Sequence, residues 1–341
     1  MSEPPAVSVC IPTRNQEDLI ADTLQSAYEQ THLVHEVIVT DDASTDGTRE
    51  TVESFRQSLP ESRRASLVYE HQAEPLGIGG NFNRAVSLGS GEFCVKVDSD
   101  DILGPRFVES LVGAMRDHPQ AGWAHCNILN VNPQRRPLEL AHARKRAGYY
   151  SPQEVFNEYL EHNDTCHCVI IRKGAYDASG GYRPEMKTCE DWLLWLEMCL
   201  AGYGCVYVDE SLAEMRKYRS RPEVMSRRRL QFVDSARIML DVLQRSLANG
   251  GAERMGVDSN RAYDTLRASV ARHVKSAAIY ETDRETQLDL FKALLTFDDS
   301  PGNRRCAWAG THFPSALVRA PREIKGTARR LAKSVLHRRS S

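Results

Sequence analysis

The first half of the sequence predicts an α/β fold with a mainly parallel sheet, and two observations support that prediction. Short apolar segments with strand character alternate with segments whose apolar residues recur at helical spacing. Such alternation is typical of parallel strands covered by helices. In addition, several strand segments end abruptly in polar or acidic residues. Because α/β proteins bind ligands at the carboxyl ends of their strands, we expect a site there.

Each element in this part is predicted from the spacing of its apolar residues. The first strand has Val7, Val9 and Ile11 in alternation and stops at the polar turn 12–15. Further strands are expected at residues 37–39, 67–69 and 93–97. Helices are expected at residues 17–28, from the Ser, Thr and Asp caps of residues 44–46 to about residue 59, and at residues 77–88.

The regular alternation ends soon after residue 101. Strands are still expected at residues 122–128, 169–171 and 205–208, with a helix at 190–200. After residue 222 the sequence shows only long helical patterns. We therefore expect an α/β domain at residues 1–220 and a helical C-terminal region at residues 221–341.

Composition narrows the cellular setting of the chain. With 341 residues and 41% hydrophobic residues it is large enough for one large or two modest domains. It has no apolar stretch long enough to cross a bilayer, and its start lacks the features of a signal peptide. Nine scattered cysteines, an odd number, are more typical of a reducing compartment than of a disulfide framework. We expect a cytoplasmic protein.

The net charge of −2 conceals an uneven distribution of charge along the chain. Residues 1–220 have 21 Lys and Arg against 33 Asp and Glu, a net charge of −12. Residues 221–341 have 23 against 13, a net charge of +10. The two parts are therefore expected to meet different partners.

The motifs that could bind a ligand or take part in a reaction lie at the ends of the predicted strands. The turn Asp98-Ser99-Asp100-Asp101 offers hard oxygen ligands to a divalent ion, which can in turn hold a diphosphate. The alternative is a solvated acidic turn. Asp41 and Asp42 follow the second strand, where they could equally serve as N-terminal charges of the next helix. The glycines in 77–80 would let a ligand approach the backbone, although their spacing is not that of a dinucleotide fingerprint.

A last motif joins Gly180-Gly181-Tyr182 to the acidic pair Glu190-Asp191. Taken alone, that pair would be an ordinary helix start. Taken in order, the turn 12–15, the Asp-Asp pair, the glycine segment, the acidic turn and this last motif resemble the family-2 glycosyltransferases. The resemblance covers roughly residues 6–220.

This resemblance implies the fold and the reaction. It implies a GT-A, Rossmann-like, mainly parallel sheet flanked by helices and followed by a helical C-terminal region. It also implies a metal-dependent, inverting transfer of a sugar from a nucleoside diphosphate, most often UDP, to a hydroxyl of a saccharide or lipid-linked acceptor. Polysaccharide or glycoconjugate biosynthesis is the expected setting.

The resemblance also assigns roles to individual residues. Asp191 is the expected catalytic base, and Asp98 and Asp100 are the expected ligands of Mg²⁺ or Mn²⁺. Asp42 is expected to accept a hydrogen bond from the base of the nucleotide. The residues expected to contact the nucleotide sugar are Pro12, Thr13, Asn15, Asp42, Gly77, Asn83, Asp98 and Arg216. Arg216 is included for its charge, because the segment around it has no histidine at the place where many relatives have one.

Two other functions remain open. A nucleotidyltransferase would share the nucleotide fold and the acidic turn, but its usual Gly- and Lys/Arg-rich signature near the N-terminus is absent. A catalytically silent sugar-nucleotide-binding or scaffold protein would bind the donor without turnover. The presence of Asp98, Asp100 and Asp191 argues against that alternative.

The end of the chain is basic. Residues 321–341 contain seven Lys and Arg and one Glu, with apolar residues at helical spacing. Such a segment could lie on an anionic membrane surface, which would make the protein peripheral at the inner face of the membrane, or it could be a solvated terminal helix. Aromatic residues are not interleaved with these charges, so we do not expect nucleic-acid binding.

Overall fold

The computed structural model describes residues 5–141, 146–218 and 222–313. The chain divides into two compact units, one of residues 1–219 with 238–263 and the other of residues 220–237 with 264–341. The predicted division at residue 220 stays a prediction.

The first unit is built on one ten-stranded sheet with the strand order β3-β2-β1-β4-β9-β6-β10-β5, in which β7 also pairs with β6 and β8 with β10. The strands are β1 (Val7–Thr13), β2 (Glu36–Asp41), β3 (Leu67–His71), β4 (Phe93–Lys96), β5 (Ile102–Leu103), β6 (Ala121–Val131), β7 (Pro137–Ala141), β8 (Gly148–Tyr150), β9 (Val169–Arg172) and β10 (Gly204–Arg216). Apolar residues that alternate or run together along β1, β2, β4, β6 and β9 largely bury these strands in the centre of the unit, whereas β7 is exposed along its length.

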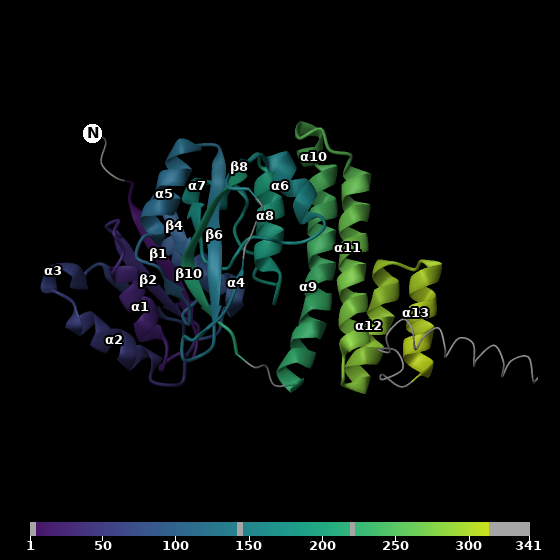
Figure 1. Cartoon of the computed structure of the whole chain (residues 1–341), viewed down its shortest axis with the longest axis horizontal. Helices are drawn as coiled ribbons and strands as arrows, with labels where there is room; N and C mark the ends of the chain where they lie inside the picture. The colour runs from purple at the N-terminus through teal and green to yellow at the C-terminus, as the bar shows by residue number, and fades with distance from the viewer. Residues whose placement is uncertain (1–4, 142–145, 219–221, 314–341) are drawn as a thin grey trace, which may run out of the picture. The chain divides into compact units, whose positions relative to one another are not determined.

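Helices cover the sheet of the first unit. In Figure 1, α1 and α2 lie on one side of the strands and α6 and α8 on the other. The helices of this unit are α1 (Ile20–Tyr28), α2 (Thr48–Ser58), α3 (Glu61–Arg64), α4 (Gly77–Leu88), α5 (Phe107–Asp117), α6 (Pro152–Tyr159), α7 (Lys173–Ala178), α8 (Glu190–Leu200) and α10 (Gly251–Arg254). The expected α/β class is confirmed.

The direction of pairing changes across the sheet. Strands β3, β2, β1 and β4 pair in parallel, as the alternation of elements predicts. Strand β9 is antiparallel to both β4 and β6, whereas β6 and β10 are parallel to each other. The sheet is therefore mixed, and the parallel part is the part in which strand and helix segments alternate regularly in the sequence.

The parallel register brings the polar strand ends together. Thr13 in β1 lies opposite Asp41 in β2, and Cys10 in β1 lies opposite Lys96 in β4. All three strands run in the same direction, so the residues that follow them emerge at one edge of the sheet. The segments that follow are the turns after β1 and β2 and the acidic turn after β4.

The aromatic residues of α8 anchor that helix to the sheet. Trp195 is 1% exposed and stacks on Trp123 of β6 with ring centroids 4.9 Å apart. The indole N–H of Trp192 donates a hydrogen bond of 2.7 Å to the backbone oxygen of Tyr159. Both tryptophans are core residues, and they fix the position of the acidic pair at the start of the helix.

The second unit is helical within the residues that the structure describes. Its elements are α12 (Arg284–Phe297), α13 (Pro301–His312) and parts of α9 (Pro222–Ala248) and α11 (Ser259–Tyr280). Arg229 forms an ion pair with the buried Glu281, and Arg284 donates to the backbone oxygens of Gly310 and Thr311. The basic segment 321–341 lies outside the described residues.

Among the described residues, no helix combines the length and the apolar character needed to cross a bilayer.

Substitutions at two glycines test how closely the elements of the first unit pack around them. Gly113 lies inside α5 with open space at its Cβ position, so Gly113→Ala should raise the free energy of unfolding by about 0.5–1 kcal/mol. A Cβ on Gly91 would lie 2.7 Å from the backbone nitrogen of Ser8, so Gly91→Ala should lower it by about 1–3 kcal/mol. Urea unfolding of both variants measures the difference, and equal stability would show that strand β1 does not approach Gly91 this closely.

Candidate functional site

The turns that follow β1 and β2 are tied to each other. The side-chain oxygen of Asn15 accepts a hydrogen bond of 2.9 Å from the backbone nitrogen of Thr45, and the backbone nitrogen of Asn15 donates to the hydroxyl of Ser44 at 2.8 Å. The backbone oxygen of Thr13 accepts from the nitrogen of Asp42 at 2.9 Å. These predicted nucleotide contacts therefore form one rigid edge, which also includes Pro12 at the end of β1.

The neighbouring aspartates Asp41 and Asp42 have different surroundings. Asp41 is fully buried and accepts hydrogen bonds from the hydroxyl of Tyr69 at 2.6 Å and the nitrogen of Ser44 at 2.9 Å. Burial works to raise the pKa of Asp41, but the hydrogen bonds from Ser44, Tyr69 and His71 outweigh it and lower that pKa. Asp41 is thus held as a structural carboxylate.

Asp42 instead faces the start of α4. Its carboxylate accepts from the backbone nitrogens of Leu76 at 2.5 Å and Gly77 at 3.2 Å, and Arg14 lies 4.0 Å away. Gly77 has a φ of +77°, a left-handed conformation that glycine adopts without strain. Asp42 and Gly77, both predicted to contact the nucleotide, are therefore in direct contact with each other.

Asn83 fastens the glycine turn of residues 180–182 to α4. Its amide nitrogen donates to the backbone oxygen of Tyr182 at 2.7 Å, and its amide oxygen accepts from the nitrogen of Tyr182 at 2.9 Å and the hydroxyl of Tyr176 at 2.5 Å. A Cβ on Gly181 would lie 2.9 Å from that same amide oxygen. Three contacts within the protein use most of the hydrogen-bonding capacity of Asn83.

The acidic turn after β4 is held by its backbone. The hydroxyl of Thr23 in α1 lies 3.0 Å from the backbone oxygen of Ser99 and 2.8 Å from that of Asp101. The nitrogen of Asp101 donates to the backbone oxygen of Asp98 at 2.9 Å, which closes the turn. The side chains of Asp98 and Asp100 are left partly exposed, whereas Asp101 is buried.

Arg216, at the end of β10, is a second residue that holds this turn in place. Its guanidinium donates to the backbone oxygen of Asp100 at 2.7 Å and to the carboxylate of Asp22 at 2.6 Å, and its backbone nitrogen donates to Asp101 at 3.1 Å. The side chain is only 2% exposed. The structure therefore places Arg216 beside the acidic turn, with its charge on Asp22, and its predicted contact with a diphosphate stays a prediction.

Lys96 is a site residue that the sequence analysis missed. It is the last residue of β4, its side chain is 8% exposed, and its ammonium donates to Asp98 at 2.7 Å. Burial works to raise the pKa of Asp98, but the charges of Lys96 and His167 outweigh it and lower that pKa. The available signal was a lysine inside an otherwise apolar strand that leads into three carboxylates.

The pKa values of the other two carboxyl groups of the turn are shifted in the opposite direction. Burial, followed by the charge of Asp98, raises the pKa of Asp100. Burial and the charges of Asp98 and Asp100 raise the pKa of Asp101 to about 8. The crowded carboxylates thus differ in charge at neutral pH, with Asp98 ionised and Asp101 largely protonated.

The acidic pair lies at the start of α8, preceded by Cys189 with a φ of 60°. One carboxylate oxygen of Asp191 accepts from the side-chain amide of Asn163 at 3.1 Å, and the other accepts from the backbone nitrogen of Trp192 at 2.7 Å. Burial and the charge of Asp191 raise the pKa of Glu190 to about 7. Asn163 is a second residue that the sequence analysis missed, because an isolated asparagine carries no local signal.

The acidic turn suits a hard divalent cation. Asp98 and Asp100 are partly exposed carboxylates on one turn, and such oxygens are the ligands that Mg²⁺ and Mn²⁺ prefer. The buried carboxyl of Asp101 is instead engaged by the nitrogen of Arg216. The residues present therefore fit the expected metal, and Asp98 and Asp100 are the ones that would hold it.

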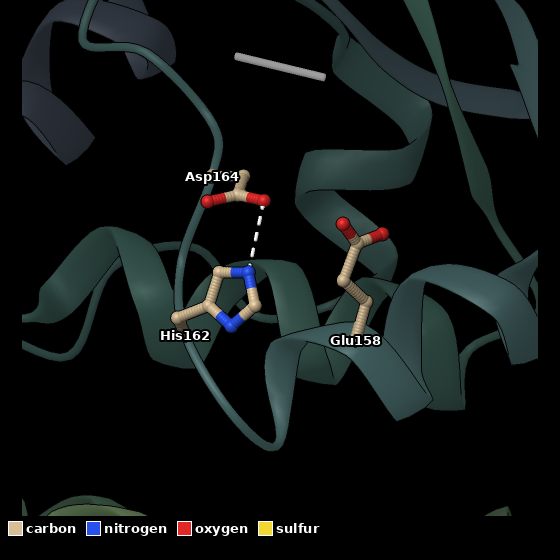
Figure 2. A group of neighbouring side chains, drawn as sticks. All are labelled: Glu158, His162 and Asp164. Atoms are coloured by element: carbon tan, nitrogen blue, oxygen red, sulfur yellow. Dashed lines mark ion pairs between the residues drawn. The ribbon is translucent and has the colours of Figure 1, made fainter. Parts of the chain in front are cut away.

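A second group of possible metal ligands lies beside Asn163. Glu158, His162 and Asp164 offer ligand atoms within 4.8 Å of one another, as Figure 2 shows. His162 lies 3.1 Å from Asp164 in an ion pair, and the His162 side chain is 54% exposed. Its pairing with Asp164 accounts for the placement of His162 without a metal ion.

Known proteins resemble this chain in sequence and in fold. Residues 8–180 match the family model described as Glycosyl transferase family 2. TuaG of Bacillus subtilis, a glycosyltransferase assigned to teichuronic acid biosynthesis, is 25% identical over 212 residues, which are 62% of this chain and 79% of TuaG.

Two solved structures show the same fold. Staphylococcus aureus TarS 1–349 in complex with UDP has a TM-score of 0.63 and 21% identity, with 89% of this chain and 82% of that chain covered. The mannosyltransferase PcManGT of Pyrobaculum calidifontis, in complex with GDP-Man and Mn²⁺, has a TM-score of 0.51 and 19% identity, with 91% and 85% covered.

The protonated state of Asp101 leads to a pH-dependent effect on stability. A pKa raised from 3.8 to about 8 contributes stability at low pH that is lost as the pH rises toward 8. Asp101→Asn mimics the protonated acid and keeps an acceptor for Arg216. The free energy of unfolding of the variant, relative to that of the wild type, should therefore increase between pH 5 and pH 8, by at most about 1.4 kcal/mol per pH unit.

Thermal and urea unfolding in EDTA measure this difference. Asp234→Asn, at a side chain that is 67% exposed, is the control and should show no such trend. A constant difference between Asp101→Asn and the wild type from pH 5 to pH 8 would show that Asp101 is ionised in the folded protein.

Proposed function

The chain belongs to glycosyl transferase family 2, and from this we propose that it transfers a sugar from UDP to an acceptor hydroxyl with inversion at the anomeric carbon. The observation that carries the proposal is the common edge of the sheet in the first unit. Asp42 follows β2, and Asp98 and Asp100 follow β4, the strands that flank β1. One edge thus provides a carboxylate that can recognise the nucleotide base and two carboxylates that can bind a metal ion.

Asp42 is the proposed reader of the nucleotide base. A carboxylate that faces a ring N–H selects a base because an unpaired polar group in a partly buried site is costly. The structures of TarS with UDP and of PcManGT with GDP-Man support a nucleoside diphosphate as the donor carrier. For this chain we propose UDP.

Asp98 and Asp100 are the proposed ligands of Mg²⁺ or Mn²⁺. When bound, such an ion neutralises the charge that develops on the departing diphosphate, which is worth several kcal/mol in the transition state. Asp98 is already oriented by Lys96, and the backbone of the turn is fixed by Thr23 and Arg216. The turn is therefore preorganised for a ligand.

Asp191 is the proposed base. Inversion by a single displacement requires the acceptor hydroxyl to lose its proton as it attacks the anomeric carbon, on the face opposite the diphosphate. The carboxylate of Asp191 takes that proton, and the hydrogen bond from Asn163 keeps the carboxylate oriented. Asp191 is half-buried at the start of α8, and the backbone nitrogen of Trp192 donates to its other carboxylate oxygen, which also restricts its motion.

The acceptor is proposed to be a saccharide or a lipid-linked saccharide. TuaG, assigned to teichuronic acid biosynthesis, supports a role in polysaccharide or glycoconjugate biosynthesis. We further propose that residues 321–341 hold the protein at an anionic membrane surface, on the strength of their basic composition alone.

Nucleotide binding tests the donor and the metal together. UDP with Mn²⁺ should raise the melting temperature of the wild type, UDP with EDTA should raise it less, and ADP or GDP should have little effect. In Asp100→Asn, Mn²⁺ should no longer increase the rise in melting temperature that UDP causes. Equal shifts with Mn²⁺ and EDTA would reject the metal ligands, and no shift with any nucleotide or nucleotide sugar would reject the proposed donor binding.

A substitution at Asp191 tests the catalytic step separately. Asp191→Asn keeps the shape of the side chain but removes the base, so transfer from UDP-sugar should fall by about 10²- to 10⁴-fold while the affinity for UDP stays unchanged. Radiolabelled or coupled UDP-release assays measure transfer. Asp177→Asn, the same change at a 59% exposed side chain, is the control. Near-normal turnover of Asp191→Asn would exclude this residue as the base.

A further inference from the structure

Lys96 occupies an unusual place for a charged side chain. It lies between β1 and β9 in the middle of the sheet, opposite Cys10 on one side and Val169 on the other. The strand residues Phe93 and Val95 are fully buried apolar residues. The side chain of Lys96 nevertheless ends in an ammonium group. This side chain is 8% exposed, and its Nζ lies 2.7 Å from a carboxylate oxygen of Asp98.

Strand β4 does not need this charge in order to form. The side chain of Lys96 is 8% exposed and that of Asp98 is 40% exposed, so the ion pair mainly costs the desolvation of Lys96. An apolar side chain of similar size at a buried position is often as stable or more stable. What the ammonium does provide is a fixed positive charge beside the acidic turn. It acts on Asp98 directly and on Glu190 at longer range.

We propose that Lys96 is a built-in counter-charge which makes tight divalent metal binding at Asp98 and Asp100 depend on the diphosphate of the donor. This inference rests on the proposed function of the acidic turn. Lys96 is a positioning residue in this account, because it acts through Asp98.

The reasoning is electrostatic. A divalent cation that binds to the turn alone meets two carboxylates, one of which is already paired with an ammonium. Repulsion between the two cations weakens metal binding, and the low local polarity strengthens that repulsion. A bound diphosphate adds negative charge on the open side of the metal and offsets the repulsion. Metal and nucleotide are then expected to raise each other's affinity by the same factor.

The experiment measures Mn²⁺ binding with and without UDP. Free Mn²⁺ is followed by electron paramagnetic resonance in titrations of the full chain. Without nucleotide, Lys96→Met should bind Mn²⁺ at least tenfold more tightly than the wild type. With saturating UDP, the wild type should gain more affinity for Mn²⁺ than Lys96→Met does, so the coupling factor should fall in the variant.

Two further variants make the result specific. Lys292→Met removes an exposed lysine that pairs with Asp289 in the second unit, and it should behave as the wild type. Asp100→Asn in the Lys96→Met background should abolish the gain in Mn²⁺ affinity, which would place that gain at the acidic turn. Lys96→Gln, a neutral polar replacement, should repeat the result and serves if Lys96→Met does not fold.

Unchanged Mn²⁺ affinity in a folded Lys96→Met or Lys96→Gln would overturn the proposal. So would a gain that persists in the Asp100→Asn background, because the added metal would then bind elsewhere. If UDP binds to neither the wild type nor the variants, the proposed function fails, whereas the comparison of Mn²⁺ affinities without nucleotide still decides the role of Lys96.

Discussion

The rest of the site depends on one constraint, which is that three carboxyl groups within four residues must be held together after β4. Asp98, Asp100 and Asp101 would repel one another if all three were ionised in this partly buried turn. The protein relieves the repulsion in two ways. Lys96 neutralises the first carboxylate, and burial keeps the third largely protonated at neutral pH. The remaining negative charge is concentrated on the exposed side of the turn, where a cation can reach it.

That constraint also explains why elements far apart in the sequence meet at the turn. Thr23 comes from α1, Arg216 from β10 and Cys168 from the residues just before β9, and each contacts the turn. Thr23 and Arg216 hold the backbone oxygens, and the backbone nitrogen of Arg216 also donates to the carboxyl of Asp101. Cys168 reaches the turn because β9 pairs with β4, and Arg216 reaches it because β5, which follows the turn, pairs with β10.

Sequence patterns predict the regular elements well and the tertiary contacts poorly. The parallel strands and the helices between them have apolar spacing that depends on local sequence alone, and the polar turns after β1, β2 and β4 are visible for the same reason. Strand β7 is exposed along its length although Leu138 and Leu140 alternate in it, and it is not among the predicted strands. Helix α5 is also absent from the predicted elements, although it has a regular apolar face. Asn163 could not be assigned because its partner Asp191 is known only from the fold, whereas Lys96 lies two residues from Asp98 and could have been found from the sequence.

The contacts of the predicted site residues also show how the site is preorganised. Asp98 and Asp191 each have an oxygen held by the protein, the first by Lys96 and the second by Asn163. A carboxylate has about four acceptor positions, so one or two such bonds orient the group and leave capacity for a ligand. Asn83 differs, since three bonds to Tyr176 and Tyr182 use most of its amide. Residues with spare acceptor capacity are therefore the ones suited to chemistry, and Asn83 is better suited to holding the glycine turn in place.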